Sequence, residues 1–454
     1  MFLGAVFADG QAPFESLYHE AYQRRLNELG PEHPKTNESL IRLGALLRTH
    51  GKADEAEPLL RRAVSQQRAS GEPSPRALEE LAAALEDLGR GEEAQNLYEL
   101  SLKQGGHDGQ SASTLLRLAA LHESQNNAKA AEQAYREAIE AFDAQDPDER
   151  IAHASALNNL GLLLEAEGRL PEAEATYRRS AARHSEAFGN RAPQTAVAWA
   201  NLAGVLFLNG DAGAAEDLYK RAIPVFESAF GNAHTNTANL HSRLGEIYET
   251  QARLDDAESE YRLALTPTTS QSLGRGLALA DLGRLAGIKG DLAEAEQTLR
   301  KAVSILKSEK LQPNAALAEA LDSLGSVLRD QSNFNEAESV LRQALALREA
   351  SPQPDHAGAA LTLVGLAGTL HMRGDLNLAE PLYLRALRLQ EDSLGPNHPD
   401  VGETLFNLGH LMSAKGEVGR GREHFERALQ ILSAAYGQND PFVAEIRSAL
   451  QSLR

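Results

Sequence analysis

Residues 157–161 read Leu157-Asn158-Asn159-Leu160-Gly161, and Gly168, Glu172-Ala173 and Tyr177 follow at fixed distances. The same arrangement returns 42 residues later around Leu202, and after a further 42 residues around Leu244. Self-similarity at a single period of roughly 20 to 50 residues is the signature of a protein built by stacking one small unit. We therefore expect a repeat array rather than a set of independent domains.

One leucine, here called the anchor leucine, marks the same place in each repeat. Six of the nine spacings between anchor leucines are 42 residues, and the others are 38, 37 and 38. This pattern predicts ten repeats, whose anchors are Leu43, Leu81, Leu118, Leu160, Leu202, Leu244, Leu282, Leu324, Leu366 and Leu408.

Small residues follow the anchor at two places. The next residue is Gly in six repeats and Ala in four. Because Gly within a helix costs about 0.5–1 kcal/mol relative to Ala, its recurrence indicates a close approach of two helices. Eight residues past the anchor, Gly occurs seven times and Asn126 once. Both types tolerate the left-handed conformation that ends a helix, so a turn is expected there, with Ala252 and Ser332 as exceptions.

A second helix follows the turn. Thirteen residues past the anchor lies Ala in nine repeats, seventeen past lies a large residue, and twenty past lies Ala or Ser. Spacings of four and three place these positions on one helical face. The alternation of small, large and small side chains predicts a ridge that packs against the first helix.

These patterns predict an all-α fold, a right-handed α-solenoid of about ten helix–turn–helix repeats with terminal capping helices. The half-repeat helix at the start is suggested by Tyr18, which lies 42 residues before Leu60, and the final helix by Phe442, Ile446 and Leu450 at helical spacing. Pro267 is expected to break the array. The predicted parts are an N-terminal segment 1–12, the half-repeat helix 13–32, repeats 1–6 over 33–265, a linker or bend 266–272, repeats 7–10 over 273–437 and a capping helix 438–454.

The anchor Leu-Gly pair, the second-helix Ala and Tyr and the 42-residue spacing resemble the tetratricopeptide repeat (TPR), in its kinesin light chain type. The linker Leu29-Gly30-Pro31-Glu32-His33-Pro34, which recurs as Leu394-Gly395-Pro396-Asn397-His398-Pro399, resembles the linker of that type. The resemblance implies a protein-binding array. A long heptad coiled coil, by which kinesin light chains join the motor, is not found before the repeats, so a motor-adaptor role is disfavoured.

Composition excludes several classes of function. The net charge of −19 has the wrong sign for a nucleic-acid-binding surface. With no cysteine there is no disulfide and no thiolate nucleophile, and none of the 14 histidines shows metal-ligand spacing. We expect no cofactor and no enzymatic activity. No stretch has the length of a membrane span. Residues 2–8 are read either as a plain start or as the tail of a signal peptide, which leaves the cytoplasm as the default and the periplasm possible.

The resemblance also implies that the first helix of each repeat lines a concave groove. Asn offers a donor and an acceptor to a peptide backbone, and Arg offers a fork for carboxylates. By the same resemblance, Asn159, Asn201 and Asn407 correspond to residues that hold peptides. The alternative is that they are ordinary polar residues on a wet surface. The predicted peptide-binding residues are Arg117, Asn158, Asn159, Asn201, Asn239, Arg243 and Asn407.

Two aromatic residues, Trp199 and Phe207, lie on the same predicted helix as Asn201 and are either ligand anchors or packing residues, with packing favoured. The leading hypothesis for function is a scaffold, expected to be a monomer, that holds extended segments of other proteins or peptides. A regulatory receptor whose curvature responds to a peptide is the alternative. An enzyme with a site assembled across repeats fits poorly, because no nucleophile–base pair or phosphate-binding loop stands out.

Overall fold

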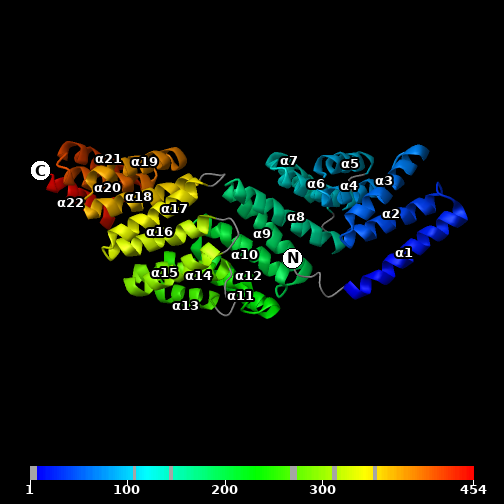
Figure 1. Cartoon of the computed structure of the whole chain (residues 1–454), viewed down its shortest axis with the longest axis horizontal. Coiled ribbons are helices and arrows are strands. Elements are labelled where there is room, and N and C mark those ends of the chain that lie inside the picture. The colour runs from blue at the N-terminus through cyan, green and yellow to red at the C-terminus, as the bar shows by residue number, and fades with distance from the viewer. Residues whose placement is uncertain are drawn as a thin grey trace. The chain divides into compact units, whose positions relative to one another are not determined.

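The computed structural model describes residues 8–105, 109–142, 147–265, 273–308, 314–350 and 355–453. These residues form 22 helices, and the chain divides into two compact units, Met1–Val225 and Phe226–Arg454 (Figure 1). The predicted all-α repeat fold is confirmed. The predicted linker 266–272 lies outside the described residues, as do the first seven residues of the predicted N-terminal segment.

The helices of the first unit alternate regularly between the two helices of each repeat. They are α1 (Ala8–Leu29), α2 (Pro34–Thr49), α3 (Ala53–Ser70), α4 (Pro75–Asp87), α5 (Gly91–Gln104), α6 (Gly109–Ser124), α7 (Ala128–Ala141), α8 (Pro147–Ala166), α9 (Leu170–Phe188) and α10 (Pro193–Leu208). Helix α11 (Ala212–Phe230) contains the boundary between the units.

The second unit continues the same alternation. Its helices are α12 (Thr235–Thr250), α13 (Leu254–Ala264), α14 (Leu273–Lys289), α15 (Leu292–Ser308), α16 (Asn314–Asp330), α17 (Phe334–Glu349), α18 (His356–Arg373), α19 (Leu376–Leu394), α20 (Pro399–Ala414), α21 (Val418–Tyr436) and α22 (Pro441–Ser452). The ten pairs from α2 with α3 to α20 with α21 contain the ten anchor leucines, and α1 and α22 flank them.

The glycine after the anchor leucine faces the large residue of the second helix in its own repeat. A Cβ added at Gly161 would lie 2.6 Å from Cε1 of Tyr177, and one added at Gly245 would lie 2.5 Å from Cε1 of Tyr261. Real Cβ atoms do not approach other atoms so closely, so the contacts of these two rings with the first helix require glycine. The predicted close approach is confirmed, and the remaining pairs are Gly44 with Leu60, Gly283 with Leu299, Gly325 with Leu341 and Gly409 with Phe425.

The turn eight residues past the anchor has a positive φ in all ten repeats. Seven of these residues are glycines, with φ between 73° and 94°. Asn126, Ala252 and Ser332 adopt the same conformation, with φ of 58°, 57° and 63°. Ala252 and Ser332, the exceptions in the sequence pattern, therefore make the same turn as the glycines, and they carry the steric cost of a left-handed backbone.

The two ends of the array are closed by single helices. At the C-terminal end, Val443 and Ile446 of α22 are buried, and the ring of Phe442 packs edge-on against that of Phe406 with centroids 5.0 Å apart. At the N-terminal end Tyr22 of α1 is buried, whereas Tyr18 is 39% exposed. Tyr18 therefore does not have the buried position expected from its spacing to Leu60, and Tyr22 packs into the core of the first repeats instead. In full repeats this position packs against the preceding first helix, and no such helix precedes α1 among the described residues.

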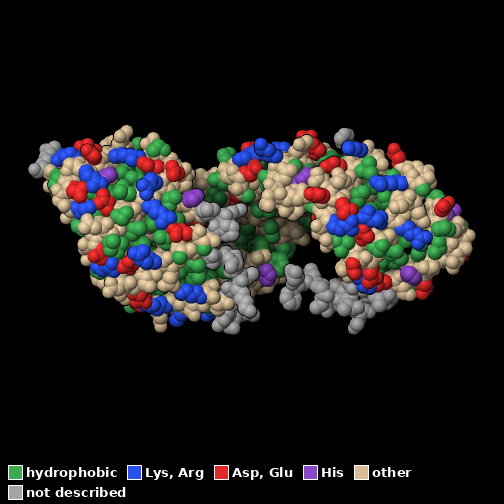
Figure 2. Space-filling model, turned by 45° about the horizontal axis from the view of Figure 1, so that its top comes forward, with side chains coloured by type: hydrophobic (Ala, Val, Ile, Leu, Met, Phe, Trp, Pro, Cys, Tyr) green, Lys and Arg blue, Asp and Glu red, His purple; other side chains and the backbone are tan. Residues whose placement is uncertain are grey.

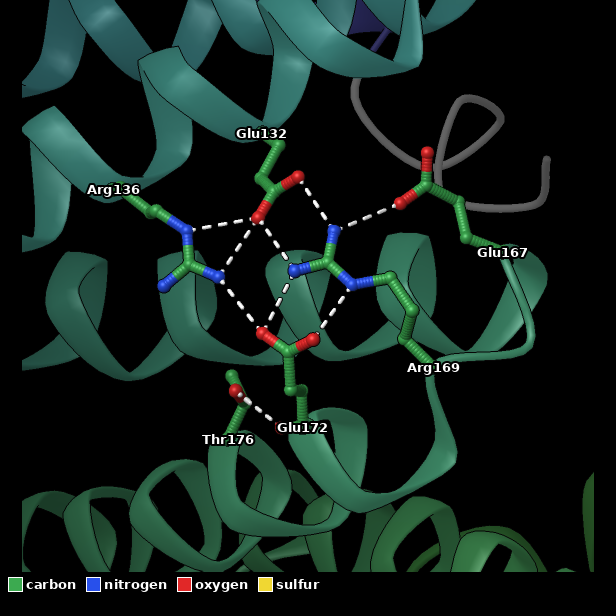
Figure 3. Close-up of polar contacts among 6 residues, drawn as sticks. All are labelled: Glu132, Arg136, Glu167, Arg169, Glu172 and Thr176. Atoms are coloured by element: carbon green, nitrogen blue, oxygen red, sulfur yellow. Dashed lines mark hydrogen bonds and ion pairs between the residues drawn. The ribbon is translucent and has the colours of Figure 1, made fainter.

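Charged side chains of neighbouring second helices form compact clusters. Arg169, at the start of α9, lies 2.7 Å from both Glu132 of α7 and Glu172 of α9, and Arg136 of α7 lies 2.7 Å from Glu132 (Figure 3). The same offsets from the anchor produce a second cluster in the first two repeats, formed by Glu57, Arg61, Arg90 and Glu93. The arginines, Glu93 and Glu172 are more than a third exposed, whereas Glu57 and Glu132 are 16% and 18% exposed. Solvent screens such pairs, so each contributes little to stability. We interpret these clusters as ion pairs that link neighbouring repeats rather than as a catalytic site.

The repeat linkers use histidine as a helix cap. Nδ1 of His33 accepts a hydrogen bond from the backbone N–H of Lys35, and Nδ1 of His398 accepts one from that of Asp400, both at 3.2 Å. The structural role expected for these two histidines is confirmed, since each satisfies a donor that the first turn of a helix leaves free.

Candidate functional site

The structure brings two of the predicted peptide-binding residues together in the first unit. Nδ2 of Asn201 on α10 donates a hydrogen bond of 2.8 Å to Oδ1 of Asn158 on α8. Both side chains are half-buried. Leu162, one turn after Asn158, is 47% exposed, and Val197, one turn before Asn201, is 40% exposed. Two first helices therefore present a paired amide with an apolar side chain at each end, here called the asparagine strip.

Two further predicted residues of this unit contact tyrosines of the preceding repeat. The side chain of Asn159 hydrogen-bonds the hydroxyl of Tyr135, and that of Arg117 hydrogen-bonds the hydroxyl of Tyr98. Burial raises the pKa of both tyrosines, which stay neutral and donate to carboxylates of their own repeats. Arg117 and Asn159 thus have a structural role between repeats, and their role in peptide binding stays a prediction.

The other predicted residues lie in the second unit and are not brought together by any contact described there. Asn239 is exposed on α12, and Arg243 on the same helix is exposed and lies 2.9 Å from Glu246. Asn407 is half-buried on α20. The seven residues therefore divide between two units. Among them, Asn158 and Asn201 are joined by a direct hydrogen bond.

The two aromatic residues near Asn201 differ in burial. Trp199 is 5% exposed, and the guanidinium carbon of Arg221 lies 4.0 Å from the centroid of its ring. Trp199 is therefore a packing residue, stabilised by a cation–π contact. Phe207 is half-buried.

A groove of about 710 Å³ lies in the second unit, over the successive first helices α14, α16 and α18. Its walls carry aliphatic side chains such as Leu277 and Leu361, and Leu361 is 59% exposed. Its floor includes Asp281, Ser323 and Gly365, the residues directly before the anchor leucines of repeats 7, 8 and 9. A cavity of this volume accommodates several residues of a peptide or a small molecule.

One wall of the groove is fixed by a buried ion-pair cluster. Arg348 of α17 is 6% exposed and reaches Asp322 of α16 at 2.8 Å and Asp355 at the start of α18. The hydroxyl of Thr362 donates to the same oxygen of Asp322 at 3.0 Å, and burial raises the pKa of Asp322. Gly358 leaves room for the guanidinium, because a Cβ there would collide with it. The cluster holds three helices in register beside the groove.

Asp281 is a half-buried charged residue of the groove with one distant ion-pair partner. Its side chain is 22% exposed, and its partner among the described residues is Arg284 at 3.7 Å. Arg284 is shared, since it also reaches Glu249 and, at 3.5 Å, the hydroxyl of Tyr261. Burial raises the pKa of Asp281 to about 7, although Arg284 opposes the rise. The carboxyl group is therefore held in the groove without the hydrogen bonds that would normally stabilise its charge.

The sequence pattern did not point to this groove. Asp281, Ser323 and Gly365 interrupt the series of Asn and Arg side chains before the anchor leucines. The available signal was their size, because Ser and Gly before two successive anchors leave open space between first helices. Charged side chains of both signs are intermingled on the face seen in Figure 2, so surface charge gave no guide.

In the described residues no helix is long and apolar enough to cross a membrane. The same residues contain no group of three or more His, Asp or Glu side chains placed to hold a metal ion.

Comparison with known proteins identifies the repeats. Tetratricopeptide repeat models match residues 15–69, 74–144, 153–228, 194–266, 316–392 and 358–432, and related models match 116–188 and 278–305. A search of curated proteins gives no match.

Several solved structures are similar to the chain. BtubC (BKLC) from P. vanneervenii is 21% identical over 52% of this chain and 94% of its own, with a TM-score of 0.41. A kinesin light chain with nearly identical TPR-like repeats from Podosopora anserina is 15% identical over 46% of this chain and 99% of its own, with a TM-score of 0.38.

A signal transduction ATPase with numerous domains (STAND) from Pyrococcus horikoshii, which has a tetratricopeptide repeat sensor, is 12% identical over 84% of this chain and 53% of its own, with a TM-score of 0.52. The shared fold agrees with the ten helix pairs described above. The chain belongs to the tetratricopeptide repeat family.

Proposed function

We propose that the protein is an interaction scaffold that holds an extended segment of a partner protein against the first helices of its repeats. The observation that carries this proposal is the groove over α14, α16 and α18, which combines exposed aliphatic side chains with fixed polar groups. A binding surface for an extended segment needs both, because apolar side chains supply affinity and oriented polar groups supply specificity.

The asparagine strip of the first unit is proposed as a second contact surface. Its amides offer both a donor and an acceptor to a peptide backbone, and Leu162 and Val197 offer apolar contacts. Arg117 and Asn159 are proposed to border it, and Asn239, Arg243 and Asn407 are proposed as separate contact residues in the second unit.

The test is selection from a library of short random peptides displayed on phage, with the purified full chain as bait. Gly365→Phe fills the groove, and a Cβ there would lie 3.6 Å from the nearest atom, an ordinary contact, so the variant is expected to fold. Gly204→Phe is the matched variant on α10, where a Cβ would also lie 3.6 Å from the nearest atom. Peptides that lose binding with Gly365→Phe identify the groove, and those that lose binding with Gly204→Phe or Asn201→Ala identify the strip. Peptides that bind all variants equally would contradict both surfaces.

A regulatory receptor is the second candidate. The Pyrococcus horikoshii relative carries its repeats as a sensor, and the fold is shared over 84% of this chain. Small-angle scattering with and without a selected peptide separates the two functions. A change in the radius of gyration supports the receptor, and an unchanged radius supports the passive scaffold.

A further inference from the structure

We infer that the groove over α14, α16 and α18 recognises a Lys or Arg side chain of the bound segment and seats its cationic group against Asp281. This inference rests on the proposed function and specifies the chemistry of its partner. It differs from a general attraction of basic peptides to an acidic protein because it depends on a single carboxyl group.

The first argument is the state of the charged groups in the groove. Each guanidinium there already has partners: Arg348 contacts Asp322 and Asp355, Arg284 contacts Glu249, and Arg329 contacts Ser326 and Asp330. On the acidic side, Asp281 lies 3.7 Å from a guanidinium that it shares, and Oδ1 of Asp322 is buried without a hydrogen-bond partner. Nε of Arg348 is a donor that is also buried without a hydrogen-bond partner, but its guanidinium already contacts two carboxylates. The groove therefore has more spare capacity to accept hydrogen bonds from a cation than to donate them to an anion.

The second argument is the surroundings of Asp281 on every helix that faces it. Helix α12 contributes Arg243, Glu246 and Glu249, α13 contributes Tyr261, and α14 contributes Arg284. Across the groove α16 contributes Glu319, Asp322 and Arg329. Carboxylates outnumber guanidiniums around it, and a ligand cation would neutralise a charge that the protein leaves poorly compensated.

The third argument is the shape of the apolar wall. Leu277 and Leu361 lie five residues before their anchors, and Asp281 lies one residue before its anchor, so Leu277 and Asp281 are one turn apart on α14. The aliphatic stem of a Lys or Arg packs on apolar surface while its charged end reaches a polar group. Leucine beside a carboxylate provides both parts of that contact.

Binding should consequently be linked to protonation. The pKa of Asp281 is about 7, so the carboxyl group is charged well above that value and neutral well below it. A ligand cation favours the charged form, and affinity should rise with pH through this range. The Lys or Arg of the peptide keeps its charge throughout this pH range. The change in affinity therefore reports the ionisation of Asp281 in the protein.

The experiment uses the random peptide library and the full chain at about pH 8, followed by fluorescence anisotropy with the best synthetic peptide. We expect peptides that depend on an open Gly365 to share a Lys or Arg at one position. Replacing that residue by Gln should weaken binding about tenfold or more, and Asp281→Asn should do the same. Asp392→Asn, an equal charge change at an exposed residue of α19, should leave affinity within about twofold. At about pH 5.5 the difference between wild type and Asp281→Asn should vanish.

Each result decides one of the two proposals. Groove-dependent peptides that carry no basic residue, or that bind Asp281→Asn as well as wild type at about pH 8, would overturn the inference and leave the scaffold function in place. If Gly365→Phe weakens the binding of no selected peptide, the groove is not a peptide-binding site. The proposed scaffold role of the groove and the inference about Asp281 would then both be wrong. Circular dichroism of Asp281→Asn checks that the variant remains folded.

Discussion

Gly161 of α8 lies directly against the ring of Tyr177 of α9, so that even one added methyl group would come within 2.6 Å of the ring. The hydroxyl of the same tyrosine donates a hydrogen bond of 2.8 Å to the carboxylate of Glu165 on α8. One side chain therefore fills the helix interface by shape and fixes its register by a hydrogen bond. This relationship explains why a residue that weakens helices recurs within them.

Gly161→Ala should destabilise the protein by about 1–3 kcal/mol, because the tyrosine must shift to admit the methyl group. Gly365→Ala is the matched control, since it also lies in a first helix but its new Cβ would make only ordinary contacts. Gly365→Ala should stabilise by up to about 1 kcal/mol through helix propensity. Urea denaturation followed by circular dichroism measures both, and equal effects of the two variants would refute the proposed close contact.

Ala252→Gly and Ser332→Gly should each stabilise their repeat by about 1 kcal/mol. Both residues have a positive φ that glycine adopts without strain, and both side chains are exposed. Gly290→Ala, at the same turn position, should have the opposite effect. Thermal unfolding measures the shift, and destabilisation by either glycine variant would show that these turns are not strained.

Arg348→Met should destabilise the second unit by about 3–5 kcal/mol, because Asp322 and Asp355 would lose the buried guanidinium between them. Arg342→Met, on the same helix, removes an exposed pair with Glu338 and should cost less than about 1 kcal/mol. Hydrogen exchange over α16 to α18 localises the effect. Similar losses for the two variants would argue against a special role of the buried cluster.

Asp281→Asn should stabilise the protein more at about pH 8 than at about pH 5. In the folded chain the pKa of Asp281 is about 7, above its ordinary value of 3.8, so the folded state binds more protons between these values. Stability is therefore lost as pH rises through that window, by at most about 4 kcal/mol, and Asn removes the loss. The melting temperatures of both proteins across this range provide the measurement, with Asp392→Asn as the control. A difference independent of pH would contradict the raised pKa.

The repeat fold was predictable because its determinants are local. The glycine after the anchor contacts a large residue sixteen positions later in the same repeat. Because both residues belong to one repeat, the contact corresponds to a fixed spacing in the sequence. The turns at Ala252 and Ser332 show the converse. Their residue types gave no signal, and the flanking helices impose the left-handed conformation on them.

The candidate site was less predictable because it depends on which groups remain unsatisfied. Asn158 and Asn201 were expected together and do form a hydrogen bond. Asn159 was read as a free groove residue, yet it also contacts Tyr135 of the repeat before it. Asp281 seemed only to break the series of amides, and its burial and shared partner become visible once α12, α14 and α16 are assembled.

The ion-pair clusters on neighbouring second helices have a consequence for how the gene can change. Glu132 and Arg136 supply the side of the cluster that faces the next repeat, and Arg169 and Glu172 supply the side that faces the previous one. Glu57, Arg61, Arg90 and Glu93 use the same offsets. Repeat 4 carries both sides, because Glu174 and Arg178 stand at the offsets of Glu132 and Arg136. A second copy of this repeat inserted beside the first would therefore meet compatible surfaces, and the array could lengthen there without new junctions.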